Sequence, residues 1–166
     1  MPKIGSITPC LWFDDKAEEA AEFYVSIFEN SRINLISYYG KEGFDTHGKA
    51  EGKVLTVDFE LDGQPFTILN GGPQFKFNEA MSLQVFCETQ ADIDYYWEKL
   101  GAGGDENSHI CGWLKDRYGL SWQIVPDVIR DFLTDPDKER AGRVFNAILE
   151  MKKLDIAELE KAYRGD

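Results

Sequence analysis

The side chains in this sequence that could do chemistry by themselves are three cysteines and two histidines among 166 residues. Cys10, Cys87 and Cys111 are odd in number and widely spaced, with no CxxC pair and no Cys/His zinc spacing. This pattern favours free, reduced thiols over a disulfide framework or a structural zinc site. Cys10 and Cys111 could act as nucleophiles, but no adjacent His or Lys would stabilise a thiolate. Buried, inert thiols are therefore the favoured interpretation.

The two histidines, His47 and His109, both lie in segments that are expected to be loops. Imidazole is a common ligand of divalent metal ions, and Asp58 or Glu60 could complete such a site in space. Histidines in loops are more often solvated than bound to a metal. His47 and His109 are therefore kept as fallback candidates for metal ligands only.

Two glutamines interrupt apolar strands: Gln84 in SLQVFC and Gln123 in SWQIVP. A polar group in such a position either faces solvent or is placed to bind a ligand. The stretch GWLKDRYGLSWQIVP predicts a β-hairpin, and Asp116 suits its tight turn because Asp bonds to its own backbone. Since side chains alternate along a strand, Trp122 should face away from Gln123 and pack in the core.

The elements that would position these residues follow a repeated order. The first half predicts a strand over 4–13, a helix capped by Asp14-Asp15, and strands over 31–39, 54–61 and 65–70. The segment 40–53, with four glycines, is expected to be a loop, either a lid or disordered. The second half predicts a strand over 81–87, a helix that begins at 89–92, and the hairpin.

We therefore predict an α+β fold of two βαβββ modules, at 1–73 and 74–126, with a helical extension over 127–166. The extension carries an apolar stripe, which must be buried on its own domain or on a partner subunit. The stripe consists of Ala141, Val144, Phe145, Ile148 and Met151.

Composition excludes several classes of function. A net charge of −12 would repel phosphate backbones, which disfavours binding to nucleic acid. No run of 18 apolar residues predicts a membrane span. The N-terminal stretch MPKIGSITPC lacks the apolar core of a signal peptide, so we expect a cytoplasmic protein.

Three stretches resemble a known family: ITPCLWFDDKAEEAAEFYVSIF, SLQVFCETQADIDYYWEKL and GWLKDRYGLSWQIVP. They resemble the PhnB-like branch of the glyoxalase/bleomycin-resistance (vicinal oxygen chelate) superfamily, whose sequences carry the label "3-demethylubiquinone-9 3-methyltransferase-like". The tail from Pro136 to Leu159 is similar to this branch as well. The resemblance implies two modules whose strands form a glyoxalase-like half-barrel, a cup around a ligand, and it implies a homodimer.

In the metal-dependent enzymes of this superfamily, the first and last strands of each module supply the ligands, usually His and Glu. Carried over to this sequence, those positions fall near Thr8, Asn70, Ser82 and Gln123. Hydroxyl and amide groups are weak substitutes for imidazole and carboxylate. The resemblance therefore implies a metal-free site, and no cofactor is predicted.

The strand faces opposite the aliphatic faces should line the cup, because the aliphatic faces pack on the helices. The candidate ligand-binding residues are Thr8, Cys10, Trp12, Asp58, Glu60, Asn70, Ser82, Gln84, Phe86, Trp113 and Gln123. Asp58 and Glu60 also suit an ordinary solvated strand face, and packing is favoured for Trp113.

The leading hypothesis is metal-free binding of a small organic molecule, with no reaction catalysed, as in drug-sequestering members of the superfamily. The alternative is a divalent-metal-dependent enzyme of the vicinal oxygen chelate type, in which the metal polarises paired oxygens of the substrate. Methyl transfer is a third hypothesis that rests on the family label alone, because no Gly-rich loop follows a strand to seat a nucleoside cofactor. A dimer with no ligand also stays open.

Overall fold

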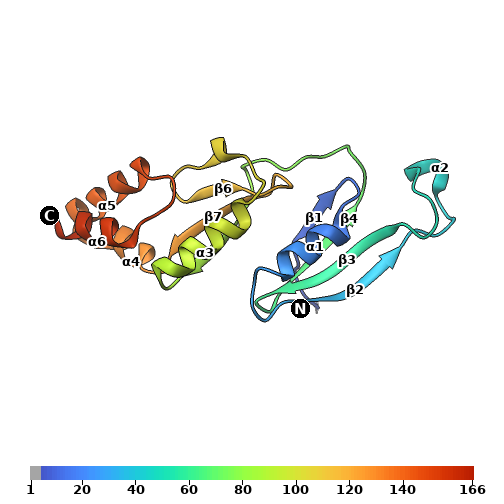
Figure 1. The fold of residues 1–166 in the computed structure, drawn as a ribbon, viewed down its shortest axis with the longest axis horizontal. Coiled ribbons are helices and arrows are strands. Elements are labelled where there is room, and N and C mark those ends of the chain that lie inside the picture. The colour runs from blue at the N-terminus through green and yellow to red at the C-terminus, as the bar shows by residue number, and fades with distance from the viewer. Residues whose placement is uncertain (1–4) are drawn as a thin grey trace, which may run out of the picture. The chain divides into compact units, whose positions relative to one another are not determined.

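The computed structural model describes residues 5–166, and the chain divides into two units, residues up to Lys76 and Phe77–Asp166. Each unit consists of one small β-sheet with a helix packed on one face of it, which confirms the predicted α+β class (Figure 1). Within residues 5–166, no helix combines the length and the apolar composition needed to cross a membrane.

The first unit is a four-stranded sheet in the order β1-β4-β3-β2, with β1 parallel to β4 and the other pairs antiparallel. Its elements are β1 (Cys10–Phe13), α1 (Ala17–Val25), β2 (Arg32–Tyr38), α2 (Phe44–His47), β3 (Val54–Leu61) and β4 (Gln64–Asn70). Alternate strand residues such as Leu11, Phe59 and Ile68 are buried, together with Tyr24 of α1. One face of the sheet therefore packs on α1 and the other face is open.

Two boundaries in the first unit differ from the sequence prediction. β1 begins at Cys10 rather than near residue 4, because Pro9 has no N–H to donate to the sheet. Residue 4 itself lies outside the described residues. The predicted cap of α1 by Asp14-Asp15 is wrong: no residue beside the helix caps it, and the Ala17 N–H donates instead to Asn70 Oδ1 at 2.9 Å.

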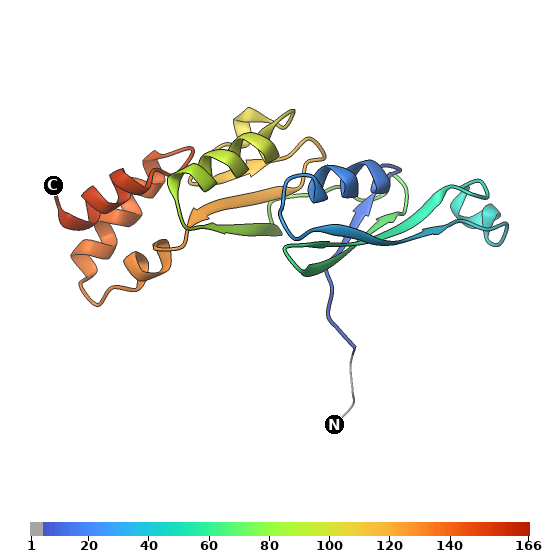
Figure 2. The ribbon, with the colours of Figure 1, turned by 60° about the horizontal axis from the view of Figure 1, so that its bottom comes forward.

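The second unit is a three-stranded sheet in the order β5-β7-β6, with α3 covering one face (Figure 2). Its elements are β5 (Ser82–Cys87), α3 (Gln90–Gly101), the 3-10 helix η1 (Glu106–Ser108), β6 (Trp113–Lys115), β7 (Ser121–Pro126), α4 (Ile129–Thr134), α5 (Lys138–Glu150) and α6 (Ile156–Arg164). The sheet has one strand fewer than a βαβββ module. Before β6, Cys111 and Gly112 have φ angles of 53° and 83°, which no extended strand can contain.

The C-terminal helices α4, α5 and α6 bury their apolar stripe within the second unit. Val144 and Ile148 of α5 pack with Phe132 of α4 and with Val125 of β7, in a cluster that also contains Leu154 and Leu159. Phe145 is the exception, because 52% of it stays exposed. The tail therefore finds its core on its own unit, which was the first of the two predicted possibilities.

A buried carboxylate organises the β6–β7 hairpin. Asp116 is only 2% exposed, and its Oδ1 accepts hydrogen bonds from the backbone N–H groups of Tyr118 and Leu120 at 2.8 and 3.1 Å. Its Oδ2 accepts from Nε1 of Trp122 at 2.8 Å. The carboxylate thus accepts the hydrogen bonds of the buried N–H groups in the turn. It also holds the indole of Trp122 on the α3 side of the sheet, as predicted.

We expect the Asp116→Ala change to lower the free energy of unfolding by about 3 kcal/mol, because three buried donors lose their acceptor. Asp116→Asn, which keeps one acceptor oxygen, should cost less. Urea denaturation followed by tryptophan fluorescence measures both changes. Asp127→Ala, at an exposed position after β7, is the control. A loss no larger than that of the control would contradict the structural role of Asp116.

Candidate functional site

The open face of the second sheet, opposite α3, carries all five candidate residues of the second unit. Ser82, Gln84 and Phe86 of β5 pair in register with alternate residues of β7, and Gln84 stands beside Gln123. Gln123 in turn pairs with Trp113 of β6. Since directly paired residues share a face of the sheet, these side chains form one surface.

Three of these side chains form a hydrogen-bonded line across the open face. Gln84 Nε2 donates to Gln123 Oε1 at 3.3 Å, and Gln123 Nε2 donates to the Ser82 hydroxyl at 2.8 Å. Gln123 is therefore held on both sides. Gln84 is exposed, and its side-chain oxygen Oε1 accepts no hydrogen bond from the other two side chains of this line. That oxygen is left to accept a hydrogen bond from a ligand.

A cavity of about 380 Å³ lies between this open face and the helices α4 and α5, and we call it the sheet–helix cavity. It is lined by Gln84, Phe86, Cys111, Trp113, Gln123, Val125, Ile129, Arg130, Leu133, Phe145, Ile148 and Leu149. Four of the predicted site residues are among them. The lining is mainly apolar with two amides and one guanidinium, a mixture that is typical of sites for small organic molecules.

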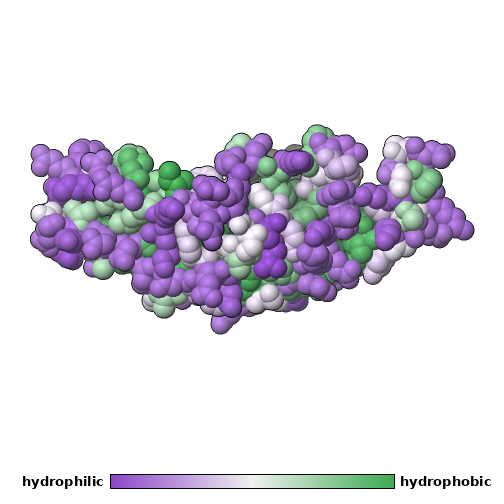
Figure 3. Space-filling view, turned by 45° about the horizontal axis from the view of Figure 1, so that its top comes forward, coloured by the Kyte–Doolittle hydropathy of each residue, from purple (hydrophilic) through white to green (hydrophobic). Residues whose placement is uncertain are grey.

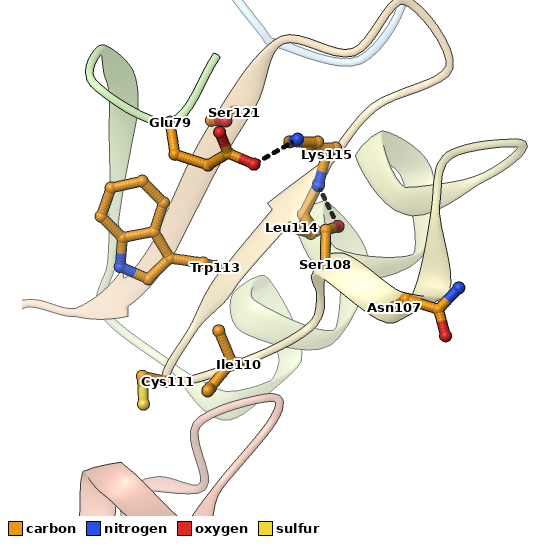
Figure 4. Close-up of a pocket in the computed structure, with 9 residues that line it drawn as sticks. All are labelled: Glu79, Asn107, Ser108, Ile110, Cys111, Trp113, Leu114, Lys115 and Ser121. Carbon is orange, nitrogen blue, oxygen red and sulfur yellow. Dashed lines mark hydrogen bonds and ion pairs between the residues drawn. The ribbon is translucent and has the colours of Figure 1, made fainter.

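A second cavity, of about 470 Å³, lies along β6, and we call it the β6 cavity (Figure 4). It is lined by Glu79, Asn107, Ser108, Ile110, Cys111, Trp113, Leu114, Lys115 and Ser121. Glu79 and Lys115 form an ion pair beside Ser121, as Figure 4 shows. The Ser121 hydroxyl is buried and has no hydrogen-bond partner among the described residues. Trp113 and Cys111 line both cavities.

Sequence reasoning missed the helical half of the sheet–helix cavity. Ile129, Arg130 and Leu133 come from α4, and Phe145 and Leu149 come from α5. The one sequence feature that pointed to this half of the cavity was Phe145, which widens the apolar stripe of α5 beyond Val144 and Ile148. The stripe did not indicate which surface Phe145 would face.

The three cysteines are free thiols in different environments. Cys87 is buried in β5, and burial, with smaller effects of Asp92 and Asp127, raises the pKa of its thiol to about 12. Cys10 is exposed, contrary to the expectation of a buried thiol, because it lies on the open face of the first sheet. Partial desolvation and then Asp58 raise the pKa of the Cys10 thiol. A raised pKa leaves less thiolate and disfavours nucleophilic chemistry at both positions.

The first unit places Cys10, Trp12, Asp58 and Glu60 on the open face of its own sheet, opposite α1. The two carboxylates are engaged there. Asp58 Oδ1 accepts a hydrogen bond from the Thr67 hydroxyl at 2.6 Å. The two oxygens of Glu60 contact Arg32 at 2.9 Å and Asn34 at 3.0 Å. These contacts support the reading of Asp58 and Glu60 as ordinary strand residues.

Trp12 packs against the chain that follows β4. Its Nε1 donates to the Gly72 carbonyl at 2.8 Å, and its ring makes an edge contact with Phe75 at 4.9 Å. Gly71 permits this packing, because a Cβ atom there would lie 2.2 Å from the indole. Thr8 lies before β1, where its hydroxyl is 3.3 Å from that of Ser6.

Asn70 is not placed with the other candidates. Its side chain lies on the α1 side of the first sheet and is 5% exposed. Oδ1 caps α1, and Nδ2 donates to the Val54 carbonyl at 3.0 Å. The prediction that Asn70 lines the open face is therefore wrong, because its amide is used on the opposite side to begin a helix that lacks a cap of its own.

The residues that the family resemblance places at metal-ligand positions do not fit a divalent ion. The amide of Asn70 is used as a cap, and Ser82 and Gln123 bind each other. His47 uses both nitrogens, since Nδ1 accepts from the Lys49 N–H and Nε2 contacts the Glu42 carbonyl. Among the described residues, no three His, Cys, Asp or Glu side chains lie together as a metal site. The ring of His109 lies against Trp97 of α3, with its centroid 4.9 Å away.

A family model described as 3-demethylubiquinone-9 3-methyltransferase matches residues 5–125 of this chain. A solved structure from Bacillus cereus, described as a 3-demethylubiquinone-9 3-methyltransferase, PhnB protein, is 38% identical with a TM-score of 0.61. The match covers 74% of this chain and 99% of that chain. Helices α4, α5 and α6 lie after the residues that the family model matches.

A more distant structure shares the fold. A protein from Pseudomonas aeruginosa is 15% identical with a TM-score of 0.51, over 75% of this chain and all 100% of that chain. A glyoxylase/bleomycin resistance protein/dioxygenase domain from Frankia is 14% identical with a TM-score of 0.44, over 75% of this chain and 93% of that one. Among curated proteins there is no match.

We expect Cys87 not to react with Ellman's reagent in the folded protein at pH 8. With a pKa of about 12 its thiolate fraction would be about one in ten thousand, and the side chain is buried. The Cys87→Ser change should therefore leave the native thiol count unchanged. In denaturant the same change should lower the count from three to two. A fall in the native count would contradict this environment for Cys87.

Proposed function

Because this chain belongs to the PhnB-like family described as 3-demethylubiquinone-9 3-methyltransferase, with a fold of the glyoxalase/bleomycin-resistance type, we propose that it binds a small organic molecule without a metal ion. The proposed site is the sheet–helix cavity of the second unit. One observation carries this proposal: the cavity joins Gln84, Phe86, Trp113 and Gln123 to the apolar side chains of α4 and α5.

The chemistry of the cavity favours an apolar or aromatic ligand. Phe86 and Trp113 offer ring surfaces on the sheet side, and Phe145 and Leu149 contribute apolar surface from α5 while staying about half exposed. Figure 3 shows hydrophobic side chains at several places on a mainly hydrophilic surface. Burial of such side chains under a ligand would remove apolar surface from water, which is the main source of affinity for small molecules.

Binding without a chemical step is favoured over the two enzymatic hypotheses. A metal-dependent reaction needs imidazole or carboxylate ligands, and the side chains at those positions are amides and hydroxyls engaged with each other or with backbone. The family description names a methyl transfer. The sequence offers no Gly-rich loop after a strand that would seat a nucleoside methyl donor.

A homodimer in the cytoplasm completes the proposal. Three free thiols suit a reducing compartment. Leu35 and Tyr38 of β2 and Phe44 of α2 are each more than half exposed, and apolar residues gathered on an edge strand and its hairpin suit contact with another subunit.

We expect Gln123→Ala to weaken the binding of an aromatic compound about tenfold, because the amide line loses its central member. Compounds are first selected by thermal shift of the unaltered protein, and dissociation constants are then measured by calorimetry. Gln64→Ala, which removes an exposed amide at the start of β4, is the matched control. Equal affinity of the Gln123→Ala and unaltered proteins would show that the ligand binds elsewhere.

The dimer predicts a mass in solution of twice the 18.9 kDa of one chain. Light scattering coupled to size exclusion measures it directly. Replacing the exposed Leu35 by Asp should lower the mass toward that of one chain, since a charge would be buried at the interface. A mass of one chain for the unaltered protein at micromolar concentration would contradict the proposed dimer.

A further inference from the structure

Arg130 is the only charged side chain among the residues that line the sheet–helix cavity. Its guanidinium carbon lies 3.9 Å from the centroid of the Phe86 ring. Within residues 5–166 Arg130 forms no ion pair with any Asp or Glu. It is therefore a cation placed against an aromatic wall of a mainly apolar cavity.

The other arginines of the chain are engaged. Three of them pair with carboxylates and two donate to backbone carbonyls, namely Arg32, Arg140 and Arg164 in the first group and Arg117 and Arg143 in the second. Arg130 differs from all of these, since within residues 5–166 its guanidinium makes a cation–π contact with Phe86 and no ion pair. Arg130 is exposed, so its hydrogen-bonding groups are available to solvent or to a ligand.

The contact between Arg130 and Phe86 is a cation–π contact, which leaves the N–H groups of the guanidinium free to donate hydrogen bonds. The N–H donors of arginine lie in the plane of the group, so a cation–π contact does not occupy them. A carboxylate can accept two of these donors in parallel, and such charge-assisted pairs are stronger than neutral hydrogen bonds. The contact with Phe86 is therefore compatible with such a pairing, because it involves the guanidinium carbon and the ring alone.

The rest of the cavity adds no competing charge. None of its other lining residues is acidic, and Asp131, the neighbour of Arg130 along α4, does not line it. The chain as a whole carries a net charge of −12 and would repel an anion at long range. A preference for an anion would therefore be local to Arg130 and would not follow from the overall charge.

We propose that the ligand of the sheet–helix cavity is an apolar, aromatic carboxylic acid whose carboxylate pairs with the Arg130 guanidinium while its rings contact Phe86, Trp113 and Phe145. This inference rests on the proposed function and adds to it the chemical class of the ligand. Arg130 and Phe145 lie beyond the part of the chain that the family model matches, so the inference concerns a feature of this chain's own tail.

The test compares 2-naphthoate with 2-naphthamide, which share their rings and differ in the carboxylate. Calorimetry gives the dissociation constant of each for the unaltered protein and for Arg130→Gln, Arg130→Lys and the control Arg164→Gln. Arg164→Gln removes the same charge at the end of α6, where Arg164 pairs with Asp166 and does not line the cavity. Cys111 lines this cavity and the β6 cavity, so its rate of reaction with a maleimide, in a Cys10→Ser background, reports binding in either of them, and the dependence on Arg130 distinguishes the two.

We expect the unaltered protein to bind the naphthoate at least about tenfold more tightly than the naphthamide. Arg130→Gln should abolish this preference without changing the affinity for the naphthamide. Arg130→Lys should keep part of it, and Arg164→Gln all of it. The naphthoate should also slow the modification of Cys111.

Four results would overturn the inference. Equal affinities for the two probes, or an equal loss of both in Arg130→Gln, would reject the carboxylate and leave the proposed binding function in place. A naphthoate preference without protection of Cys111 would place the anion outside this cavity. Failure of both probes to bind the unaltered protein would reject the proposed binding function together with the inference.

Discussion

The buried carboxylate of Asp116 sets the geometry on which the second unit depends. A charged group that is only 2% exposed is costly unless it is fully hydrogen-bonded, and here two backbone N–H groups and the indole of Trp122 supply the bonds. With Trp122 held on the α3 side, the alternation of the strand places Gln123 on the open face. One interaction in a tight turn thus decides which side chains of β7 are available to a ligand.

The C-terminal helices turn that open face into a cavity. Their apolar stripe packs on the end of the sheet, and the backbone N–H groups of Cys111 and Gly112 donate to the carbonyls of Met151 and Lys152, each at 2.7 Å. Gly112 has a φ of 83°, and a Cβ atom there would lie 3.0 Å from the Ile124 carbonyl and 3.1 Å from Leu154. A glycine at position 112 therefore permits the close approach of β7 and the segment around Leu154. In this arrangement Arg130 and Phe145 line the same cavity as Phe86 and Trp113.

The polar groups of the first unit are used by the fold itself. At the end of β4, the amide of Asn70 caps α1. The carboxylates on the open face of this sheet are paired with Thr67, Arg32 and Asn34. Polar groups that are engaged in this way stabilise the fold and leave the binding of a ligand to apolar surface and a few amides.

Sequence patterns alone predict the α+β class, the two sheets, the hairpin around Asp116 and the opposite orientation of Trp122 and Gln123. These features follow from alternation, turn chemistry and apolar stripes, which are local properties of the chain. Other features follow from packing between distant segments: Asn70 caps a helix from 53 residues away, and Cys10 is exposed. Arg130 and Phe145 likewise line a cavity together with Gln84 and Phe86. Contacts of this kind join segments far apart along the chain, and no local pattern in the sequence specifies which surfaces will meet.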